Sequence, residues 1–444
     1  MSPYFSKEPR LIGPGPEALT AAGDNPQTQI VAVWFGCRLS LRKVPAHCPV
    51  RVSGRSQFKL FVNGESRLFG PCRSARDVAY LDELDLAPWL RAGENRLVWQ
   101  VLSYPEHPRT LQLCAHDAYE DCPYYEQLMY ACDTRLEILF TYAATDDVAL
   151  PRQAIRLFAA SALENGLTQA RFPARSRQVI PMFALYFVLM LEEYLAHTGD
   201  AAFVAPYLPL AERIVETFLT KRCKNGLLAP QGYWDYFDAT REWEKNGPAV
   251  TPTAVKDGAS ALQNLFFVYA CQSLCRILPQ FHRADLAAHY RDACRRLLTL
   301  VEDLCYDTAR GLYREGPETV EYSQHTQIYA VLTGLAQGEK AQRLMERVLT
   351  DKSLIPCSFM QQYSLFRALE KVGMYARTGE LWQTWQHFID LHCTTFPETP
   401  YAPRSDCHAW SALPLWEFAR DRAAAHSATP PPDVPPEQSG VQSM

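Results

Sequence analysis

The feature that most constrains the fold is a change in hydrophobic periodicity along the chain. From about residue 30 to 103, short apolar runs such as 58–62 are separated by turn sequences such as Asn63-Gly64. From about residue 125 to 419, apolar residues recur with the spacing of helices, as in 284–304. Short runs bounded by turns predict strands, and the longer period predicts amphipathic or buried helices. A small β domain followed by a larger helical one is therefore expected.

The helical region divides into about eleven or twelve segments joined by short loops. Thr198-Gly199-Asp200 is a typical junction, because a glycine ends one helix and an aspartate caps the next. The segments show no fixed repeat length, which disfavours a solenoid. The predicted fold is therefore mainly α, an (α/α)6 toroid preceded by a small N-terminal β-sandwich.

Composition shifts predict the domain boundaries. The 444 residues allow two or three domains at about 150 residues each. We expect an N-terminal arm (1–28), an accessory β-sandwich (29–108), an (α/α)6 catalytic domain (109–424) and a disordered Pro-rich tail (425–444).

Charge and composition exclude several function classes. A net charge of −5 gives no reason to expect a nucleic-acid partner. The richest apolar run, 181–191, is shorter than the ~20 residues of a membrane helix, and the N-terminus lacks the pattern of a signal peptide. The 14 cysteines are scattered, and those at 271, 275 and 294 fall in helical patterns. We therefore expect reduced core thiols, a cytoplasmic location, and no metal or organic cofactor. A homo-oligomer is compatible with the sequence.

Two stretches gather chemically active side chains. In 121–133, Pro123 is a typical first helical residue, so Glu126 is expected in the first turn of a helix that carries Tyr130 and Asp133 on the same face. The simpler interpretation of such a face is that it is only solvated.

The second stretch runs from Thr394 to Trp410. Pro397 and Pro400 bracket Glu398, which is therefore expected in a rigid, non-helical loop, with His408 and Trp410 at the start of the next helix. Loops held by a scaffold often carry functional groups, although a plain surface loop fits the same pattern.

Together the two stretches resemble the bacterial α-L-rhamnosidases, glycoside hydrolase family 78. In that family an Asp-Cys-Pro motif is followed by a Glu and an Asp at the spacing of Asp121, Glu126 and Asp133. The family also has a Glu-bearing loop before a His-Ala-Trp helix start, here Glu398 with His408-Ala409-Trp410. Further matches are Arg171-Phe172-Pro173, Trp234 with Phe237-Asp238, Ser323 to Gln327, and the β-rich segment 60–95.

The resemblance implies an inverting glycoside hydrolase that removes terminal α-L-rhamnose from glycosides or oligosaccharides, with a carbohydrate as its partner. Glu126 would be the general acid and Glu398 the general base, about 6.5–9.5 Å apart to admit a water. Asp121 and Asp133 would raise the pKa of Glu126 and bind sugar hydroxyls. The resemblance also implies that Trp234 and Trp410 pack on the methyl-bearing face of the sugar. Its hydroxyls would be contacted by Arg171, Asp238, His325 and His408.

The chain departs from the family in two places. Only residues 102–120 join the β region to the helical one, where relatives have a further β-rich domain, and the β-domain that usually follows the barrel is replaced by the Pro-rich tail. These differences support one alternative, a truncated carbohydrate-binding relative that does not hydrolyse. Another (α/α)6 exo-glycosidase, such as an unsaturated-uronide hydrolase with an arginine-rich cleft, is the second.

Overall fold

The computed structural model describes residues 31–52, 57–70, 82–103, 108–247, 250–256, 258–391, 393–401 and 403–428. The chain divides into two compact units, residues 1–106 and 107–444. The predicted arm and the predicted tail from residue 429 lie outside the described residues, and the last helix continues past the predicted boundary at 424 to Ala428. In the described ranges, no helix has the length and apolar character needed to cross a membrane.

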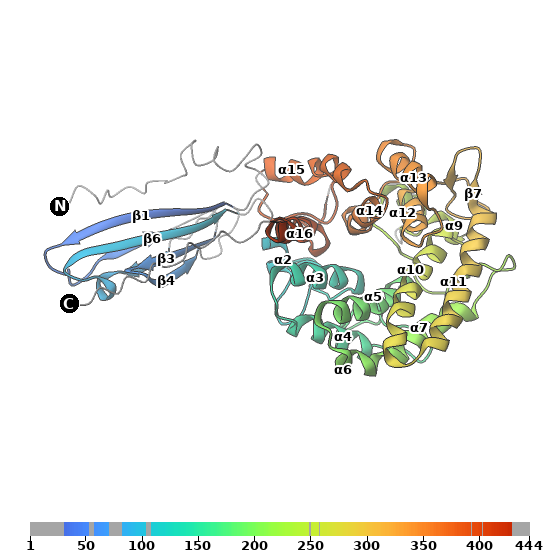
Figure 1. Cartoon of the computed structure of the whole chain (residues 1–444), viewed down its shortest axis with the longest axis horizontal. Coiled ribbons are helices and arrows are strands. Elements are labelled where there is room, and N and C mark those ends of the chain that lie inside the picture. The colour runs from blue at the N-terminus through green and yellow to red at the C-terminus, as the bar shows by residue number, and fades with distance from the viewer. Residues whose placement is uncertain are drawn as a thin grey trace, which may run out of the picture. The chain divides into compact units, whose positions relative to one another are not determined.

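The described strands of the first unit form two antiparallel sheets (Figure 1). The larger has the order β1-β6-β3-β4, with β1 at Val31–Leu41, β6 at Gly93–Ser103, β3 at Gln57–Val62 and β4 at Glu65–Gly70; the smaller pairs β2 (Pro49–Val52) with β5 (Asp82–Asp85). Asn63 and Gly64 join β3 to β4 with φ values of 54° and 91°, as a tight hairpin turn requires. The predicted hairpin is confirmed.

Residues of both sheets contribute to one small apolar core. Its buried members are Leu60, Val62, Leu86, Leu90 and Leu97, with Val50 and Leu84 of the smaller sheet packed against them. Asn95 is fully buried in this unit, and its amide both accepts from the Arg91 N–H (2.8 Å) and donates to the Arg91 carbonyl (2.7 Å). A buried polar side chain is tolerated because it is hydrogen-bonded. The β-sandwich of residues 29–108 stays a prediction.

The second unit is built from paired helices. Its longer helices are α3 (Ala131–Ala144), α4 (Ala149–Ala160), α5 (Pro181–Thr198), α7 (Leu208–Thr220), α10 (Ala261–Ile277), α11 (Ala284–Cys305), α12 (Gln324–Leu332), α13 (Gly338–Thr350), α14 (Phe359–Lys371), α15 (Gln383–Asp390) and α16 (Leu413–Ala428). Shorter elements are α2 (Pro108–Leu113), α6 (Ala201–Val204), α8 (Arg241–Glu244), α9 (Thr253–Lys256), β7 (Tyr306–Asp307), β8 (Leu312–Tyr313) and the 3₁₀ segments η2 (Ala205–Tyr207), η3 (Leu278–Phe281), η4 (Tyr375–Glu380) and η5 (Ala409–Ala412).

The helices close into a ring (Figure 1). Helix α3 packs on α5, α5 on α10, α10 on α12 and α12 on α14; α14 contacts η5, which with α16 packs back on α3. The inner helix α5 is buried on all sides along residues 181–191. The outer helix α13 buries only one stripe, Ala341, Leu344, Met345 and Val348. The predicted toroid is confirmed.

Local sequence signals set the helix boundaries. Gly199 ends α5 with a φ of 69°, and the Asp200 carboxylate caps α6 by accepting the Phe203 N–H at 3.0 Å, as predicted. The helical stretch after Asp200 is divided into α6, η2 and α7. Proline lies at the start of both η2 and α7, where it removes a backbone donor. The cysteines at 271, 275 and 294 are free and buried, as predicted.

A buried ion pair joins the first two inner helices. The Arg135 side chain of α3 is 3% exposed, and its Nε donates to Glu193 Oε1 of α5 at 3.0 Å. The guanidinium also lies 5.1 Å from the ring centroid of Tyr363 of α14. A charge taken out of water is tolerated only with such partners.

Glu193→Gln is expected to lower the free energy of unfolding by about 3–5 kcal/mol, because it leaves the Arg135 charge buried without a counter-charge. Urea denaturation measures the change. Glu339→Gln is the matched control, since its ion pair with Arg343 is exposed on both sides and should matter little. Equal effects of the two substitutions would contradict the importance of the buried pair.

Candidate active site

A closed loop precedes α3. Asp121 accepts the Leu128 N–H on its Oδ1 atom (2.9 Å), and its own N–H donates to the Leu128 carbonyl (2.9 Å). Within this loop Gln127 has a φ of 53°, in the left-handed region that interrupts a right-handed helix. Helix α3 begins only at Ala131.

The prediction that Pro123 starts a helix carrying Glu126 is therefore wrong. The Asp121 carboxylate competes with helix formation by binding a nearby backbone amide, so Glu126 lies in a loop. Tyr130 nevertheless meets Glu126, because its hydroxyl donates to Glu126 Oε2 at 2.6 Å. The Glu126 side chain remains 26% exposed.

The loop around Glu398 is non-helical, as predicted, and is held together by hydrogen bonds. The Glu398 N–H donates to the Ser405 carbonyl (2.9 Å), and the His408 N–H donates to the Phe396 carbonyl (2.9 Å). Trp410 donates from its indole N–H to the Glu398 carbonyl at 2.8 Å. These bonds hold the backbone of Glu398 while its side chain stays half-buried.

The two loops meet although they are 278 residues apart in the chain. The contacts between them are Arg404 Nη2 to Glu126 Oε1 at 2.6 Å, His408 Nε2 to Asp133 Oδ1 at 3.0 Å, and the Ala409 N–H to the Asp121 carbonyl at 2.9 Å. The residues that the sequence singled out in two separate stretches thus form one site.

Glu126 is held as a carboxylate. Burial alone would raise its pKa, but hydrogen bonds from Tyr130 and Arg404 and the nearby Arg171 charge outweigh burial and leave the pKa below its ordinary value. Arg171 Nη1 lies 3.9 Å from Glu126 Oε2 and donates to the Tyr130 hydroxyl at 2.8 Å.

The prediction that Asp121 and Asp133 raise the pKa of Glu126 is therefore wrong. Two of the groups that set its pKa, Arg171 and Arg404, come from other loops. The aspartates carry the raised values instead. Burial, then the Asp133 charge, raises the pKa of Asp121 to about 6, and burial raises that of Asp133 to about 8.

His408 completes a buried group with these aspartates. Burial lowers its pKa, so it is neutral at pH 7, and its ring contacts that of Trp410 with centroids 4.0 Å apart and planes tilted by 40°. Since Asp133 is mostly protonated at the same pH, the Asp133–His408 contact is a neutral hydrogen bond and not an ion pair.

Glu398 lies within the electrostatic reach of the same groups. The hydrogen bond that Arg404 donates to Glu126 is the largest cause that raises the pKa of Arg404, and the Glu398 charge adds to it. Burial is the largest cause that raises the pKa of Tyr236, and Glu398 contributes there after Asp238, Asp133 and Cys132. One guanidinium therefore lies in the fields of both predicted catalytic carboxylates. Trp234 is half-buried, with its ring 5.3 Å from that of Tyr236.

Asp238 and His325 lie deeper than the other predicted residues. Both are fully buried and bonded to each other, His325 Nε2 to Asp238 Oδ2 at 2.6 Å. Asp238 also accepts the backbone N–H of Ser358 (2.9 Å) and of Ala239 (2.7 Å). These bonds favour a role in holding the surrounding backbone over a direct contact with a sugar. The predicted contact of Asp238 and His325 with sugar hydroxyls stays a prediction.

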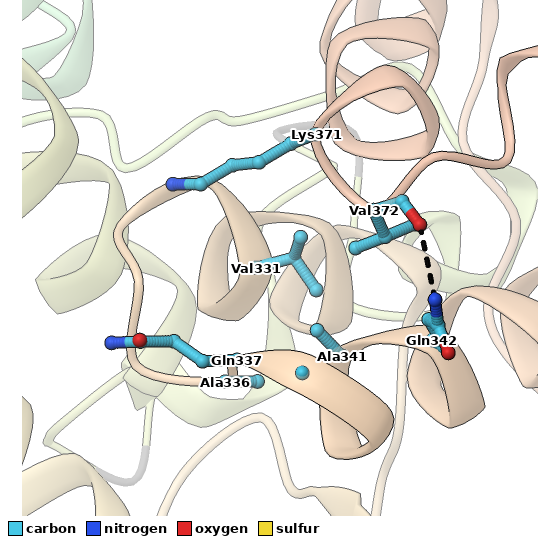
Figure 2. A pocket seen from close by; sticks show the side chains of 8 residues that line it. Val331, Ala336, Gln337, Ala341, Gln342, Lys371 and Val372 are labelled. Atoms are coloured by element: carbon cyan, nitrogen blue, oxygen red, sulfur yellow. Dashed lines mark hydrogen bonds between the residues drawn. The ribbon is translucent and has the colours of Figure 1, made fainter.

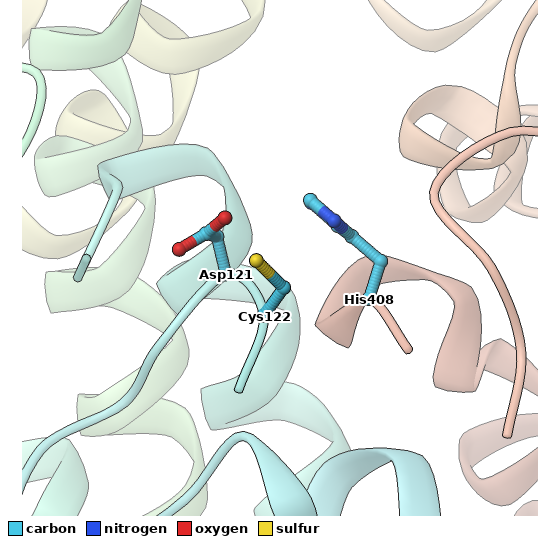
Figure 3. A group of neighbouring side chains, drawn as sticks. All are labelled: Asp121, Cys122 and His408. Carbon is cyan, nitrogen blue, oxygen red and sulfur yellow. The ribbon is translucent and has the colours of Figure 1, made fainter. Parts of the chain in front are cut away.

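Among the residues that the structure describes, two buried groups have the composition of metal ligands. Figure 3 shows Asp121, Cys122 and His408, whose ligand atoms lie within 4.8 Å of one another; Asp238, His325 and Cys357 form the second group. Asp121 and Asp238 already accept backbone N–H groups, and His408 and His325 already pair with aspartates. The hydrogen bonds explain both groups, and the expected lack of a metal stays a prediction.

Sequence reasoning missed Arg404 and understated Tyr130. Arg404 was detectable as a cation in the same loop as Glu398, but nothing local indicates that it reaches Glu126. Tyr130 was placed near Glu126 by a helical spacing that the structure does not have.

A shallow pocket of about 250 Å³ lies between α12, α13 and α14 (Figure 2). Its lining residues are Val331, Ala336, Gln337, Gly338, Ala341, Gln342, Lys371 and Val372. The cationic residue of this lining, Lys371, donates a hydrogen bond from its Nζ atom to the Leu332 carbonyl (2.6 Å). None of the predicted site residues lines this pocket.

The sequence profile described as bacterial alpha-L-rhamnosidase 6 hairpin glycosidase domain matches residues 104–415, more than half of the chain. No curated protein sequence matches.

Solved structures share the fold. A GH78 family rhamnosidase of Bacillus sp. GL1 has a TM-score of 0.64 at 21% identity, over 88% of this chain and 45% of that one. A rhamnosidase from Klebsiella oxytoca with rhamnose bound has a TM-score of 0.63 at 18% identity, over 89% of both chains. A GH63 mannosylglycerate hydrolase from Thermus thermophilus has a TM-score of 0.51 at 11% identity, over 70% of this chain and 98% of that one. This chain thus spans less than half of the Bacillus protein.

Asp133→Asn is expected to become more stabilising, relative to the wild type, as the pH rises from about 5 to about 8. The folded-state pKa of Asp133, about 8, exceeds the value of about 4 in an unfolded chain, so its contribution is fully present below pH 4 and is lost as the pH rises through 8. Asparagine stays neutral and suffers no such loss. Urea denaturation at both pH values measures this difference, with the exposed Asp117→Asn as control. A difference that does not vary with pH would refute the raised pKa.

Proposed function

The chain belongs to the bacterial α-L-rhamnosidase six-hairpin glycosidase family, and we propose that it is an inverting hydrolase of terminal α-L-rhamnosides. Its family and its structural neighbours are glycoside hydrolases. The observation that carries the proposal is the meeting of the Glu126 and Glu398 loops, joined by the Arg404–Glu126 ion pair. We propose the cytoplasm as its location and a carbohydrate as its partner.

The proposed reaction adds one water across the glycosidic bond. Glu126 gives a proton to the glycosidic oxygen as the bond to the anomeric carbon breaks. A water attacks that carbon from the opposite face of the sugar, and Glu398 takes the proton that the water loses. The products are rhamnose with inverted anomeric configuration and the leaving alcohol.

The resting site is not yet in the acid form that this reaction needs. Both oxygens of Glu126 accept strong hydrogen bonds, from Tyr130 and from Arg404. Tyr130 accepts from Arg171, so its hydroxyl proton stays directed at Glu126. Arg404 has a half-exposed side chain and is the partner that can leave when the substrate binds.

The remaining residues have proposed binding roles. Asp121, Asp133, His408 and Arg171 supply polar groups for sugar hydroxyls, and Trp234 and Trp410 offer apolar surface to the methyl group. A carbohydrate-binding protein without turnover does not need both Glu126 and Glu398. Another exo-glycosidase of this fold is the stronger alternative, because two arginines lie beside Glu126.

Glu126→Gln is expected to lower kcat/KM on an alkyl or disaccharide rhamnoside by about 10²–10⁴-fold, and much less on p-nitrophenyl α-L-rhamnoside, whose leaving group needs little protonation. Glu398→Gln should abolish hydrolysis of both, because neither substrate replaces the base. Steady-state kinetics on the two substrates measures the pattern, with Glu339→Gln as control. Similar losses on both substrates for Glu126→Gln would disprove its role as acid.

The first product of the wild type is expected to be β-L-rhamnose, because a single displacement inverts the α linkage. Proton NMR of the anomeric signals during the first minutes, before mutarotation, distinguishes the two anomers. Initial release of the α anomer would show a retaining mechanism and reject Glu398 as a base acting on water.

A further inference from the structure

The surface beside Glu126 is aromatic and cationic. Tyr124 is 80% exposed and Tyr125 is 53% exposed, and their rings meet edge to face with centroids 5.1 Å apart. The Arg404 guanidinium lies 5.3 Å from the Tyr125 centroid, and the Arg404 side chain is 53% exposed. Tyrosines this open, next to a proposed catalytic residue, offer an aromatic ring face on which a sugar ring can stack.

This surface lies on the leaving-group side of the proposed reaction. A general acid protonates the glycosidic oxygen, so the group beyond that oxygen lies next to Glu126. Tyr124 and Tyr125 directly precede Glu126 in the same loop, and Arg404 binds the Glu126 carboxylate itself. A ligand on these three side chains would therefore be the part of the substrate that leaves.

Charge balance indicates what that part carries. The charged and titratable groups around Glu126 and Arg404 are Arg171, Tyr130, Cys122, Asp133, His408 and Glu398. When Glu126 takes up the proton that it must donate, Arg404 and Arg171 lose the Glu126 charge, and Glu398 remains as the carboxylate in the field of Arg404. A neutral leaving group cannot replace the hydrogen-bonded charge that Arg404 loses, whereas a carboxylate can.

We propose that Arg404, with Tyr124 and Tyr125, is a subsite for a leaving sugar that bears a carboxylate, so that the preferred substrates are rhamnosyl uronates. This inference rests on the proposed function. The substrate carboxylate draws Arg404 away from Glu126, and Glu126 then loses a hydrogen bond and a cation that favour its ionised form. Recognition of the leaving sugar and protonation of the acid are thus coupled through one side chain.

The test compares α-L-rhamnosyl-glucuronic acid with its methyl ester. The leaving sugar is charged in the acid and neutral in the ester, and the hydroxyl group released from rhamnose is the same in both. The wild type is expected to prefer the acid in kcat/KM by about tenfold, as one charge-assisted hydrogen bond implies. Arg404→Gln should abolish this preference, and Arg404→Lys should restore part of it. Arg175→Gln removes an exposed arginine from the loop that carries Arg171 and should keep the wild-type ratio.

The alkaline limb of the pH–rate profile on the ester, which follows ionisation of the general acid Glu126, gives a second readout. Arg404→Gln should shift that limb to higher pH, because Glu126 then holds its proton more easily. Equal rates on acid and ester in the wild type, or a preference that survives in Arg404→Gln, would overturn the subsite while leaving rhamnoside hydrolysis intact. No hydrolysis of either compound by folded protein would overturn the proposed function, and the subsite with it.

Discussion

The closure of the helical ring is the constraint on which the rest of the structure depends. The segment around residue 409 packs on the loop before α3 through the backbone bond from Ala409 to Asp121, and on α3 itself through the contact of His408 with Asp133. Without this closing segment, which includes η5 and α16, α3 would lack a neighbour on one side, and Glu126 and Glu398 would belong to unrelated loops. The same bonds that complete the fold therefore assemble the site.

Ring closure also explains the unusual electrostatics. Asp133 lies in the first turn of α3, where a helix N-terminus favours negative charge, yet full burial raises its pKa to about 8. Glu126, a few residues earlier, remains in contact with water and with cations, and its pKa is lowered. Two carboxyl groups near in sequence thus prefer opposite protonation states because only one of them is covered by the closing segment.

The sequence predicts those features that depend on near neighbours in the chain. The Asn63-Gly64 hairpin, the Gly199-Asp200 junction and the buried run at 181–191 follow from local conformational preferences and apolar spacing. The family resemblance adds the ring and the pairing of the two Glu-bearing loops. The helix expected at Pro123 fails because a single carboxylate, Asp121, binds the Leu128 amide. The pKa of Glu126 and the contact with Arg404 depend on residues far along the chain, which no local pattern encodes.

The buried position of α5 has a consequence for folding during translation. This helix is apolar on every side along residues 181–191, and its cover includes α10 and α3. As the chain leaves the ribosome, α5 emerges before α10 (Ala261–Ile277), the helix that packs most extensively on it. The nascent chain therefore exposes an apolar helix until about residue 277 has emerged, and during this interval aggregation competes with folding.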